Sequence, residues 1–415
     1  MPDTYMAAQQ TKVMGSTQVT AKRGCPACGA SHVRSFYKVA NVPVNSCVLM
    51  RSPGEAIAYP RGEIDLCFCD RCGFIFNRAF DPQLIEYSER YEETQGFSDT
   101  FNAFHKALAK LLIDRYDLHG KNLIEIGCGK GEFLTMLCEL GMNRGIGFDP
   151  SYVAHRSRAS KTERATFVTD FYSERYTDLE ADFICCKMTL EHIPTVEKFV
   201  SMVRSVTERN PAAVVFFQVP EVTLILEQFG FWDIYYEHCS YFTPASLRSL
   251  FERCGFDVRD IWVDYGAQYL MIEATRSGKS ERAAPNCGSE TQTLAEKVDR
   301  FAKVVPAQHA AWKKRLDDWA AQKLKVVLWG SGSKAVSFMT TLGITHELQF
   351  VVDINPHRQG MFMPGTGHTI VSPDFLIDYK PDRIIAMNPI YREEIDKMLK
   401  ERGLEPVLST VVDSA

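Results

Sequence analysis

The sequence predicts an α/β protein that has two parallel sheets and a small cysteine-rich module ahead of them. From about residue 95 to 275, apolar strand-like runs alternate with amphipathic helical stretches, a pattern typical of βαβ units. A second set of this kind begins with KVVLWGSGSK at residue 325. Paired cysteines and two short β-type runs, EIDLCFC and FIFN, precede both sets.

Changes in composition divide the chain into five segments. We expect a flexible tail over 1–22, a cysteine-rich module over 23–85, a first α/β domain over 86–275, a linker with helices over 276–323, and a second α/β domain over 324–415. The linker is placed where periodicity is lost and Ser, Gly and charged residues gather. Pro306 interrupts the helical stretch and is expected to kink or split it.

Charge and hydropathy argue against several classes of protein. The chain has 47 Lys and Arg against 52 Asp and Glu, a formal net charge of −5, which gives no bulk attraction to nucleic acid or anionic membranes. No apolar run is long enough for a transmembrane helix, and the polar first 22 residues lack the apolar centre of a signal peptide. We therefore expect a cytoplasmic protein with no membrane and no nucleic-acid partner.

The cysteines predict a metal site. Cys25-Pro-Ala-Cys28-Gly and Cys69-Asp-Arg-Cys72-Gly are two CxxCG pairs, and a two-residue spacer lets both thiolates reach one tetrahedral ion at about 2.3 Å. Four Cys ligands leave no open position for a water nucleophile, so the expected zinc ion is structural. The alternative is a set of reduced core thiols, which the odd total of 13 Cys also favours over disulfides. Cys67 is assigned to the strand and excluded from the ligands.

The first α/β domain is expected to contain five strands, NLIEIG, RGIGFD, ATFVTD, DFICCKM and AVVFFQV. The first strand runs into the loop E-x-G-x-G-x-G, which contains Glu125, Gly127, Gly129 and Gly131. Glycines there allow a ligand to approach the backbone at a helix N-terminus. Asp149 ends the next strand about 20 residues later, where a carboxylate accepts two ribose hydroxyls, and Asp170 ends the third as a candidate partner for an adenine amino group.

The loop, the later Asp149 and the TLEHI segment resemble class I S-adenosylmethionine (SAM)-dependent methyltransferases. This resemblance implies that Glu125, Gly127, Gly129 and Gly131 form the SAM loop and that Asp149 binds the ribose. A dehydrogenase would require G-x-G-x-x-G, whereas this loop reads G-C-G-K-G-E.

The order of the parts resembles the sugar C-methyltransferases of antibiotic and deoxysugar pathways. The resemblance implies a class I methyltransferase Rossmann-like domain with a small N-terminal zinc-binding module and a second Rossmann-like C-terminal domain. Members of this family act on nucleotide-linked 4-keto-6-deoxysugars at C3. Residues 235–242, YYEHCSYF, resemble the family's Y-x-E-H-x-S-Y-F active-site segment, whereas VPVNSCVLMRSPGEAIAYPRG at 42–62 departs from the family.

Methylation of carbon requires a carbanion, and a neighbouring ketone makes its C–H acidic enough for a side-chain base. His238 is the predicted base, because an imidazole has an unperturbed pKa of about 6.5. Tyr235 or Tyr241 would polarise the keto oxygen, and Glu237 would orient the imidazole or hold a sugar hydroxyl. His192 is the rival base, although a cofactor-lining role is expected for it.

Tyr91 resembles a family tyrosine that reaches the sugar, with Tyr87 as a neighbouring candidate for the same position. In the second α/β domain, the loop Trp329-Gly-Ser-Gly-Ser-Lys334 makes Ser331 and Lys334 candidates for holding a sugar nucleotide. His368 is a further candidate for the same role. The alternative is a purely structural domain that covers the active site.

Together these features predict a SAM- and zinc-containing C-methyltransferase of a nucleotide-linked keto-deoxysugar. Two alternatives stay open: O- or N-methylation of another small metabolite, and a zinc-knuckle methyltransferase that binds RNA. The sequence specifies neither the sugar, the nucleotide, the stereochemistry nor the oligomeric state.

Overall fold

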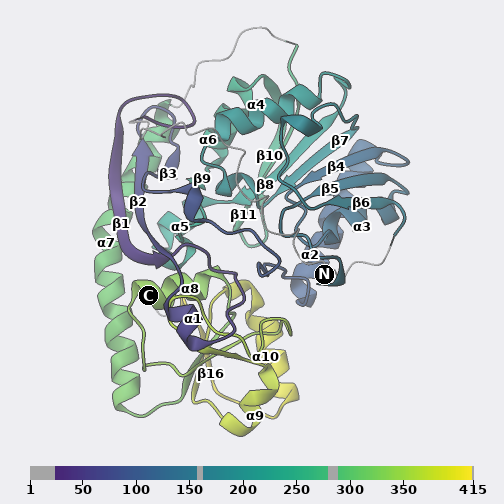
Figure 1. Cartoon of the computed structure of the whole chain (residues 1–415). Helices are drawn as coiled ribbons and strands as arrows, with labels where there is room; N and C mark the ends of the chain where they lie inside the picture. Colours follow the sequence, from purple (N-terminus) through teal and green to yellow (C-terminus); the bar gives the residue numbers. More distant parts are fainter. Residues whose placement is uncertain (1–23, 157–161, 279–287, 414–415) are drawn as a thin grey trace, which may run out of the picture.

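The computed structural model describes residues 24–156, 162–278 and 288–413. The predicted tail over 1–22 and part of the predicted linker lie outside these residues. The described residues form three sheets of four, seven and five strands, with the order β1-β2-β3-β9, β10-β11-β8-β7-β4-β5-β6 and β14-β13-β12-β15-β16. The α/β fold class is confirmed, and Figure 1 shows how the three sheets are arranged.

The N-terminal sheet is antiparallel and contains both predicted β-type runs. Its strands are β1 (Val33–Pro43), β2 (Arg61–Cys69), β3 (Ile75–Asn77) and β9 (Ser240–Tyr241), and the short helix α1 (Pro53–Ile57) lies between β1 and β2. The fourth strand comes from a much later part of the chain and pairs with β3. This pairing fixes the segment YYEHCSYF against the cysteine-rich module.

The central sheet confirms the five predicted strands. They are β4 (Asn122–Ile126), β5 (Arg144–Phe148), β6 (Ala165–Val168), β7 (Phe183–Lys187) and β8 (Val214–Pro220), all mutually parallel. An antiparallel hairpin of β10 (Phe256–Asp264) and β11 (Tyr269–Arg276) extends the sheet at one edge. Its turn, YGAQ, lacks the Asn-Gly or Asp-Gly pair that marks a tight hairpin in a sequence.

Helices cover both faces of the central sheet, as the apolar character of its strands requires. Apolar side chains of α4 (Val196–Val206) and α6 (Pro244–Arg253) pack on one face. Those of α2 (Asp99–Tyr116) and α3 (Glu132–Leu140) pack on the other. The short helix α5 (Val222–Glu227) follows β8 and packs against the N-terminal part of the core.

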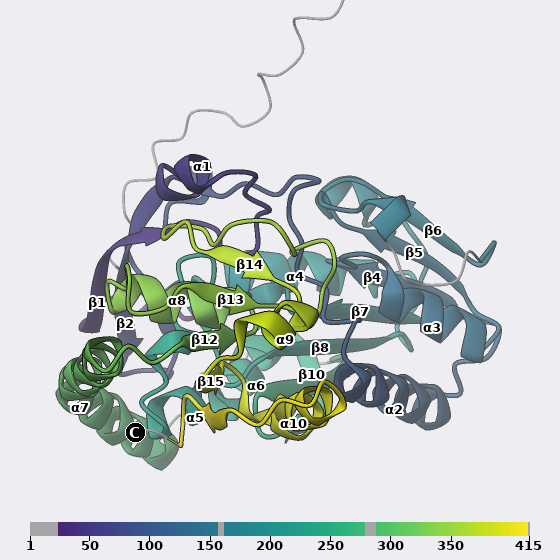
Figure 2. The ribbon, with the colours of Figure 1, turned by 90° about the horizontal axis from the view of Figure 1, so that it is seen from below.

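The C-terminal sheet is parallel throughout and confirms the second predicted α/β set. Its strands are β12 (Val326–Trp329), β13 (Phe350–Val352), β14 (Thr369–Val371), β15 (Arg383–Ala386) and β16 (Val407–Thr410). Its helices are α8 (Ser333–Thr341), α9 (Leu376–Tyr379) and α10 (Arg392–Glu401). Figure 2 shows this sheet from below.

Of the two effects expected of Pro306, a kink or a split, the split is wrong, because α7 (Gly288–Ala321) is one helix with Pro306 inside it. Pro306 is exposed, so water can solvate the carbonyl group that loses its intrahelical partner. The opposite face buries Val298, Phe301 and Trp312 in the core shared with the N-terminal and C-terminal sheets. This long packed face holds the helix together across the proline, and α7 runs along one side of the molecule (Figure 1).

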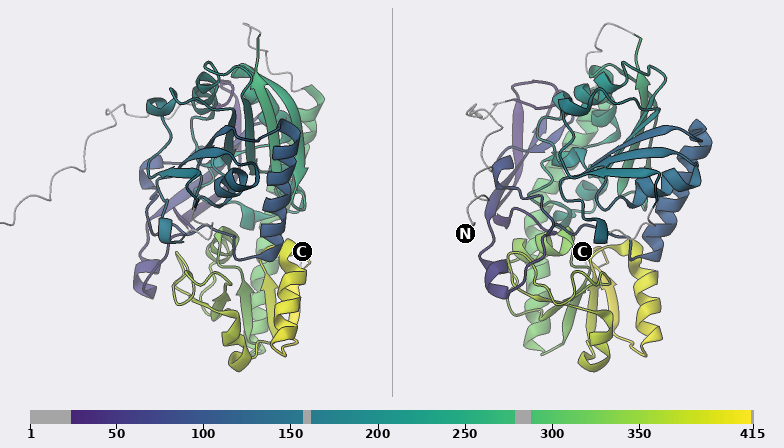
Figure 3. Two further views of the ribbon diagram at one scale, coloured as in Figure 1. Left: turned by 90° about the vertical axis from the view of Figure 1, so that its right-hand side faces the viewer. Right: turned by 45° about the vertical axis from the view of Figure 1, so that its right-hand side comes forward.

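The glycine loops after β4 and β12 open toward the same region between the two α/β parts, which Figure 3 shows from two further sides. Ligands of parallel α/β sheets bind at the carboxyl ends of the strands.

None of the helices in the described ranges has both the length and the apolar character that a membrane crossing requires.

We predict that Trp312→Ala lowers the free energy of unfolding by about 3–5 kcal/mol, the usual effect of deleting a buried aromatic ring. Trp312 is 1% exposed and lies edge-on to Phe338 of α8, with 5.1 Å between ring centroids. Lys303→Ala on the exposed face of α7 is the control and should change the value by less than about 0.5 kcal/mol. Urea titration followed by circular dichroism measures both, and equal small effects would contradict the role given to α7.

Candidate active site

Two neighbouring cavities lie between the parts of the molecule. The larger, about 620 Å³, is lined by the loop after β4 and by residues after β5 and β7. The smaller, about 270 Å³, is lined by the loop after β12 and residues after β8 and β13. Cys47, Glu93 and Ser333 are among the residues that line both. Two ligands, or two halves of one reaction, can therefore meet at their junction.

The loop after β4 needs its glycines for two separate reasons. Gly127 has φ 71° and Gly131 has φ 78°, a left-handed conformation that side chains disfavour. A Cβ on Gly127 would lie 1.9 Å from the Thr189 hydroxyl, and one on Gly131 would meet the Phe167 ring at 2.4 Å. The loop is therefore packed against its neighbours and keeps its backbone amides at the start of α3.

Asp149 holds this loop from the end of β5. Its carboxylate accepts hydrogen bonds from the Gly129 amide at 2.9 Å and from both the amide and the hydroxyl of Ser151 at 2.7 Å. Asp149 also lines the larger cavity, together with Glu125, Gly127 and Gly129. Glu125 is 2% exposed and accepts a hydrogen bond from the Leu134 amide, and burial raises its pKa to about 7.

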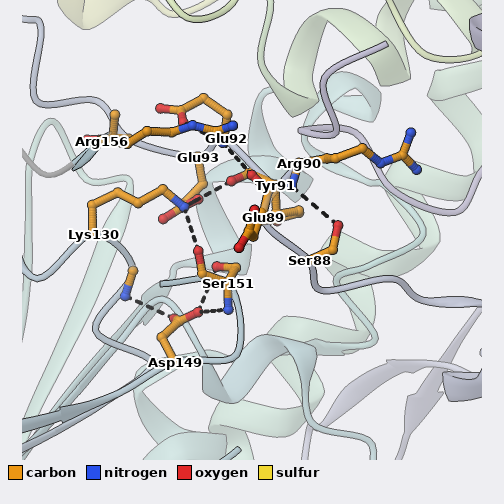
Figure 4. A network of polar contacts seen from close by, with 12 residues as sticks. Ser88, Glu89, Arg90, Tyr91, Glu92, Glu93, Lys130, Asp149, Ser151 and Arg156 are labelled. Atoms are coloured by element: carbon orange, nitrogen blue, oxygen red, sulfur yellow. Dashed lines mark hydrogen bonds and ion pairs between the residues drawn. The ribbon is translucent and has the colours of Figure 1, made fainter. Parts of the chain in front are cut away.

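Lys130 joins this loop to the chain segment that precedes α2 (Figure 4). Its ammonium group donates to the carbonyl groups of Tyr91 at 2.9 Å and Ser151 at 3.1 Å, and lies 3.2 Å from the Glu93 carboxylate. Lys130 is 2% exposed. A buried ammonium group that has three oxygen partners fixes the position of this segment relative to the glycine loop.

His238 lies beside two other rings at the wall of the larger cavity. Its ring centroid is 4.1 Å from that of Tyr235 and 4.8 Å from that of His192. Burial lowers the pKa of His238 well below its usual value, with His192 and Lys334 adding to the effect. The imidazole is therefore neutral at physiological pH, the form that accepts a proton. Tyr87 contacts the Nδ1 atom of His192 at 3.0 Å.

Glu237 lies next to His238 in the chain and is surrounded by hydrogen-bond donors. Tyr91 donates its hydroxyl at 2.9 Å, Ser46 donates both its amide at 3.0 Å and its hydroxyl, and Asn45 donates an amide N–H at 3.4 Å. Glu237 is 1% exposed. Such a set of donors stabilises a carboxylate anion. Tyr91 and Tyr87 are the two candidates for the tyrosine that reaches the sugar. Tyr91 contacts Glu237, whereas Tyr87 contacts His192.

Several residues singled out in the sequence lie outside the two cavities. Asp170 is bonded to Tyr176 and Arg175, although the next residue, Phe171, lines the larger cavity. Gly131, Tyr241, Ser331 and His368 line neither cavity. Tyr241 is buried in β9, Ser331 is bonded to Asp353, and His368 contacts the carbonyl group of Leu348. In contrast, Lys334 and Tyr235 both line the smaller cavity. The Lys334 ammonium group pairs there with the Asp233 carboxylate.

Sequence reasoning missed residues that reach the site from distant parts of the chain. They are Asn45, Ser46, Cys47, Glu93, Lys130, Glu191 and Arg358. Lys130 stands inside the glycine loop and Glu191 inside TLEHI, so both were within reach of the motifs. No local signal identifies the others, because their partners lie far away in sequence.

The four cysteines of the CxxCG pairs converge on one point. Cys25 and Cys72 have their sulfur atoms 3.6 Å apart, as do Cys28 and Cys69, close to the roughly 3.8 Å that a tetrahedron with about 2.3 Å Zn–S bonds requires. All four are buried, and their sulfur atoms lie within 4.8 Å of one another. Cys67 is not part of this group. The donor set therefore fits a tetrahedral zinc ion.

Comparison with known proteins agrees with this architecture. A family model described as a methyltransferase domain matches residues 98–261, and a model described as a C-methyltransferase C-terminal domain matches residues 273–405. The chain is 25% identical over 357 residues to the C-methyltransferase NovU of Streptomyces niveus, which covers 81% of this chain and 83% of that protein.

Two solved methyltransferase structures align with less than half of this chain. Magnesium protoporphyrin IX methyltransferase of Synechocystis PCC 6803 is 17% identical, covers 43% of this chain and 84% of its own, and has a TM-score of 0.34. 1,6-didemethyltoxoflavin-N1-methyltransferase of Burkholderia thailandensis is also 17% identical, covers 42% of this chain and 78% of its own, and has a TM-score of 0.32. On the two consecutive family models and the relative that spans both, the chain belongs to the SAM-dependent C-methyltransferase family.

Proposed function

We propose that this enzyme transfers a methyl group from SAM to the carbon next to the ketone of a nucleotide-linked keto-deoxysugar. The observation that carries the proposal is the neutral, buried His238, which lines the same cavity as the glycine loop. The similarity of this chain to the C-methyltransferase NovU supports carbon as the atom that accepts the methyl group.

The larger cavity fits the cofactor. Its volume of about 620 Å³ lies within the usual range for small-molecule sites. The amides after β4 and the carboxylate of Asp149 would hold the amino-acid and ribose parts, and bound SAM supplies an electrophilic methyl group. Because Asp170 is bonded elsewhere, we assign the adenine to the neighbourhood of Phe171 rather than to that carboxylate.

His238 would remove the proton from the carbon next to the ketone. Glu237 is held by Tyr91 and Ser46, so it is best suited to orienting groups around His238 rather than to moving. The Tyr235 ring lies against His238, and its hydroxyl is the candidate donor to the enolate oxygen. Tyr241 is not retained for this role, because it lines neither cavity.

The smaller cavity is the candidate site for the nucleotide. Two cations, Lys334 and Arg358, line it beside the glycine loop after β12, and they offer charge for a diphosphate. Trp329 and Tyr391 add aromatic surface to its wall. The sugar would then lie at the junction with the larger cavity, near Ser333 and within reach of His238.

We further propose that Cys25, Cys28, Cys69 and Cys72 hold a structural zinc ion. Gly29 and Gly73 follow the two pairs with φ 71° and 69°, and each donates its amide to the carbonyl group of the first cysteine of its pair. The site packs against Phe74, which contacts Phe242 just after β9. Zinc there would stabilise the wall behind the active-site segment.

We predict that Asp149→Ala lowers SAM affinity by about ten- to a hundredfold, because charge-assisted hydrogen bonds are lost. Asp170→Ala is the matched control and should lower affinity by less than about threefold, since its carboxylate bonds Arg175 and Tyr176. Isothermal titration measures both. Unchanged affinity for Asp149→Ala would remove this residue from the cofactor site.

We expect about one zinc ion per chain in the purified enzyme, and its loss in Cys25→Ser together with a lower melting temperature. Cys67→Ser is the control that keeps its zinc, because Cys67 is outside the sulfur cluster. Metal analysis by mass spectrometry reads out both variants. Protein that is fully folded yet free of zinc would contradict the proposal.

We predict that His238→Asn binds SAM and acceptor but loses about 10²–10⁴-fold in turnover, the usual contribution of a general base. It should also lose exchange of the acidic acceptor hydrogen with deuterated solvent, measured by NMR without a methyl donor. Since the lowered pKa keeps His238 neutral, wild-type exchange should not decline until the pH is well below 6.5. His119→Asn on the exposed surface is the control.

Exchange at the wild-type rate in His238→Asn would identify another base, with His192 the next to test. Wild-type protein that neither exchanges nor methylates any nucleotide-linked keto-sugar would overturn the acceptor class. Membership of the SAM-dependent family would stand in both cases.

A further inference from the structure

Glu191 is a buried carboxyl group that the proposed function does not use. It lies in the 3-10 turn η4 (Leu190–His192) after β7, is 0% exposed and borders the larger cavity. Among the described residues, neither of its carboxyl oxygens has a hydrogen-bond partner. This contrasts with Glu237, whose oxygens are surrounded by donors. A buried carboxylate without donors is costly, so the neutral acid is favoured.

Within the part of the chain that the structure describes, the groups around Glu191 include no lysine or arginine. Titratable side chains that face it are Cys186, Cys239, Tyr87, Tyr269, His192 and His238. None of these is a lysine or arginine, and burial raises the pKa of Glu191 to about 8. At pH 7 the group is therefore mostly protonated in the enzyme without ligands.

The carboxyl group is nevertheless close to the proposed base. One of its oxygens and a nitrogen of each imidazole, His192 and His238, all lie within 4.8 Å of one another. Two backbone-linked contacts keep the turn and the active-site segment together: the Cys239 amide donates to the Glu191 carbonyl group at 2.9 Å, and the Ser240 hydroxyl donates to the Ile193 carbonyl group at 3.0 Å. The charge state of Glu191 must therefore affect His238.

SAM carries a sulfonium ion, a fixed positive charge, whereas its product S-adenosylhomocysteine carries a neutral thioether at the same atom. The reacting methyl group must meet the carbon that His238 deprotonates, so the sulfonium charge enters the cavity on the side of Glu191. A positive charge in a poorly solvated site favours the ionised form of a neighbouring acid.

We propose that Glu191 is a neutral acid in the cofactor-free enzyme and releases its proton to solvent when the sulfonium form of the cofactor enters the cavity. His238 then faces a carboxylate only while a methyl donor is present. The carboxylate stabilises the imidazolium ion that forms when His238 takes a proton from the acceptor. Glu191 thereby acts as a positioning and charge-compensating residue, a role that rests on the proposed function of His238.

The test is isothermal titration of the zinc-loaded full-length enzyme with SAM and with S-adenosylhomocysteine, in buffers of different ionisation enthalpy at pH 7. We expect SAM to release about 0.5–1 proton per chain more than the product does. Burial also raises the pKa of Glu93 and Glu125 to about 7. Glu93 is bonded to Lys130 and Glu125 to the Leu134 amide, and comparison of SAM with its product cancels protons released by contacts that both ligands make.

Glu191→Gln should abolish the difference in proton release between the two ligands. Glu237→Gln is the matched control, because it alters the neighbouring carboxylate that already has donors, and the difference should persist in it. Equal release by SAM and product in wild type, or a difference that survives in Glu191→Gln, would overturn the proposal. So would a second bound metal ion that is lost in Glu191→Gln, since a metal would then be the partner of the cluster.

A measurement on the wild-type enzyme alone covers the case in which Glu191→Gln fails to fold. A ligand that expels a proton binds more tightly as the pH rises. The preference for SAM over its product should therefore increase about three- to tenfold between pH 7 and pH 9, and proton release should decline above pH 8. A preference that is flat with pH overturns the proposal. Neither arm needs an acceptor, so failure here is distinct from failure of the sugar assignment.

Discussion

A three-residue segment, Tyr91 to Glu93, connects the parts of this enzyme, and its buried centre is Glu92. The Glu92 side chain is 0% exposed and lies 3.0 Å from the Asn355 amide and 3.6 Å from Arg156. Arg358, 6% exposed, donates to the backbone carbonyl group of Glu92 and to that of Ser331. Buried charges are tolerated only with partners of this kind. The C-terminal and central domains are therefore both held to one short piece of chain.

The two neighbours of Glu92 carry this constraint into the active site. Tyr91 donates to Glu237, next to the proposed base His238, and Glu93 pairs with Lys130 in the glycine loop proposed to hold the cofactor. A shift of the C-terminal domain would therefore disturb the base and the cofactor loop together. Active sites require such positions to be held within a fraction of an ångström. The C-terminal domain therefore helps to position the proposed active site, although the proposed base and the glycine loop after β4 lie outside it.

Local patterns predicted the parts of the fold that local interactions determine. The five central strands, the glycine loop and the CxxCG pairs each depend on a few consecutive residues, and the structure brings all four cysteines together. The error at Pro306 has the opposite origin, because packing of Phe301 and Trp312 with distant strands outweighs the local effect of a proline. Asp170 and Tyr241 were predicted as site residues from their positions in motifs. In the structure Asp170 bonds Arg175 and Tyr176, Tyr241 is buried in β9, and neither lines a cavity. The partners of Glu237 could not be predicted, since Asn45 and Ser46 lie about 190 residues away.

The stretch over 42–62, which we expect to depart from the resembling family, reaches the junction of the two cavities. Ser46 donates its amide to Glu237, and its hydroxyl oxygen lies 2.6 Å from the Ser333 hydroxyl. Cys47 lies 3.5 Å from the same Ser333 hydroxyl and lines both cavities. The glycine loop and His238 lie on other elements, but Glu237, the residue before His238, accepts hydrogen bonds from this stretch. A change in this stretch would therefore alter both the lining of the junction and the hydrogen bonds of Glu237, while the residues of the glycine loop stay the same.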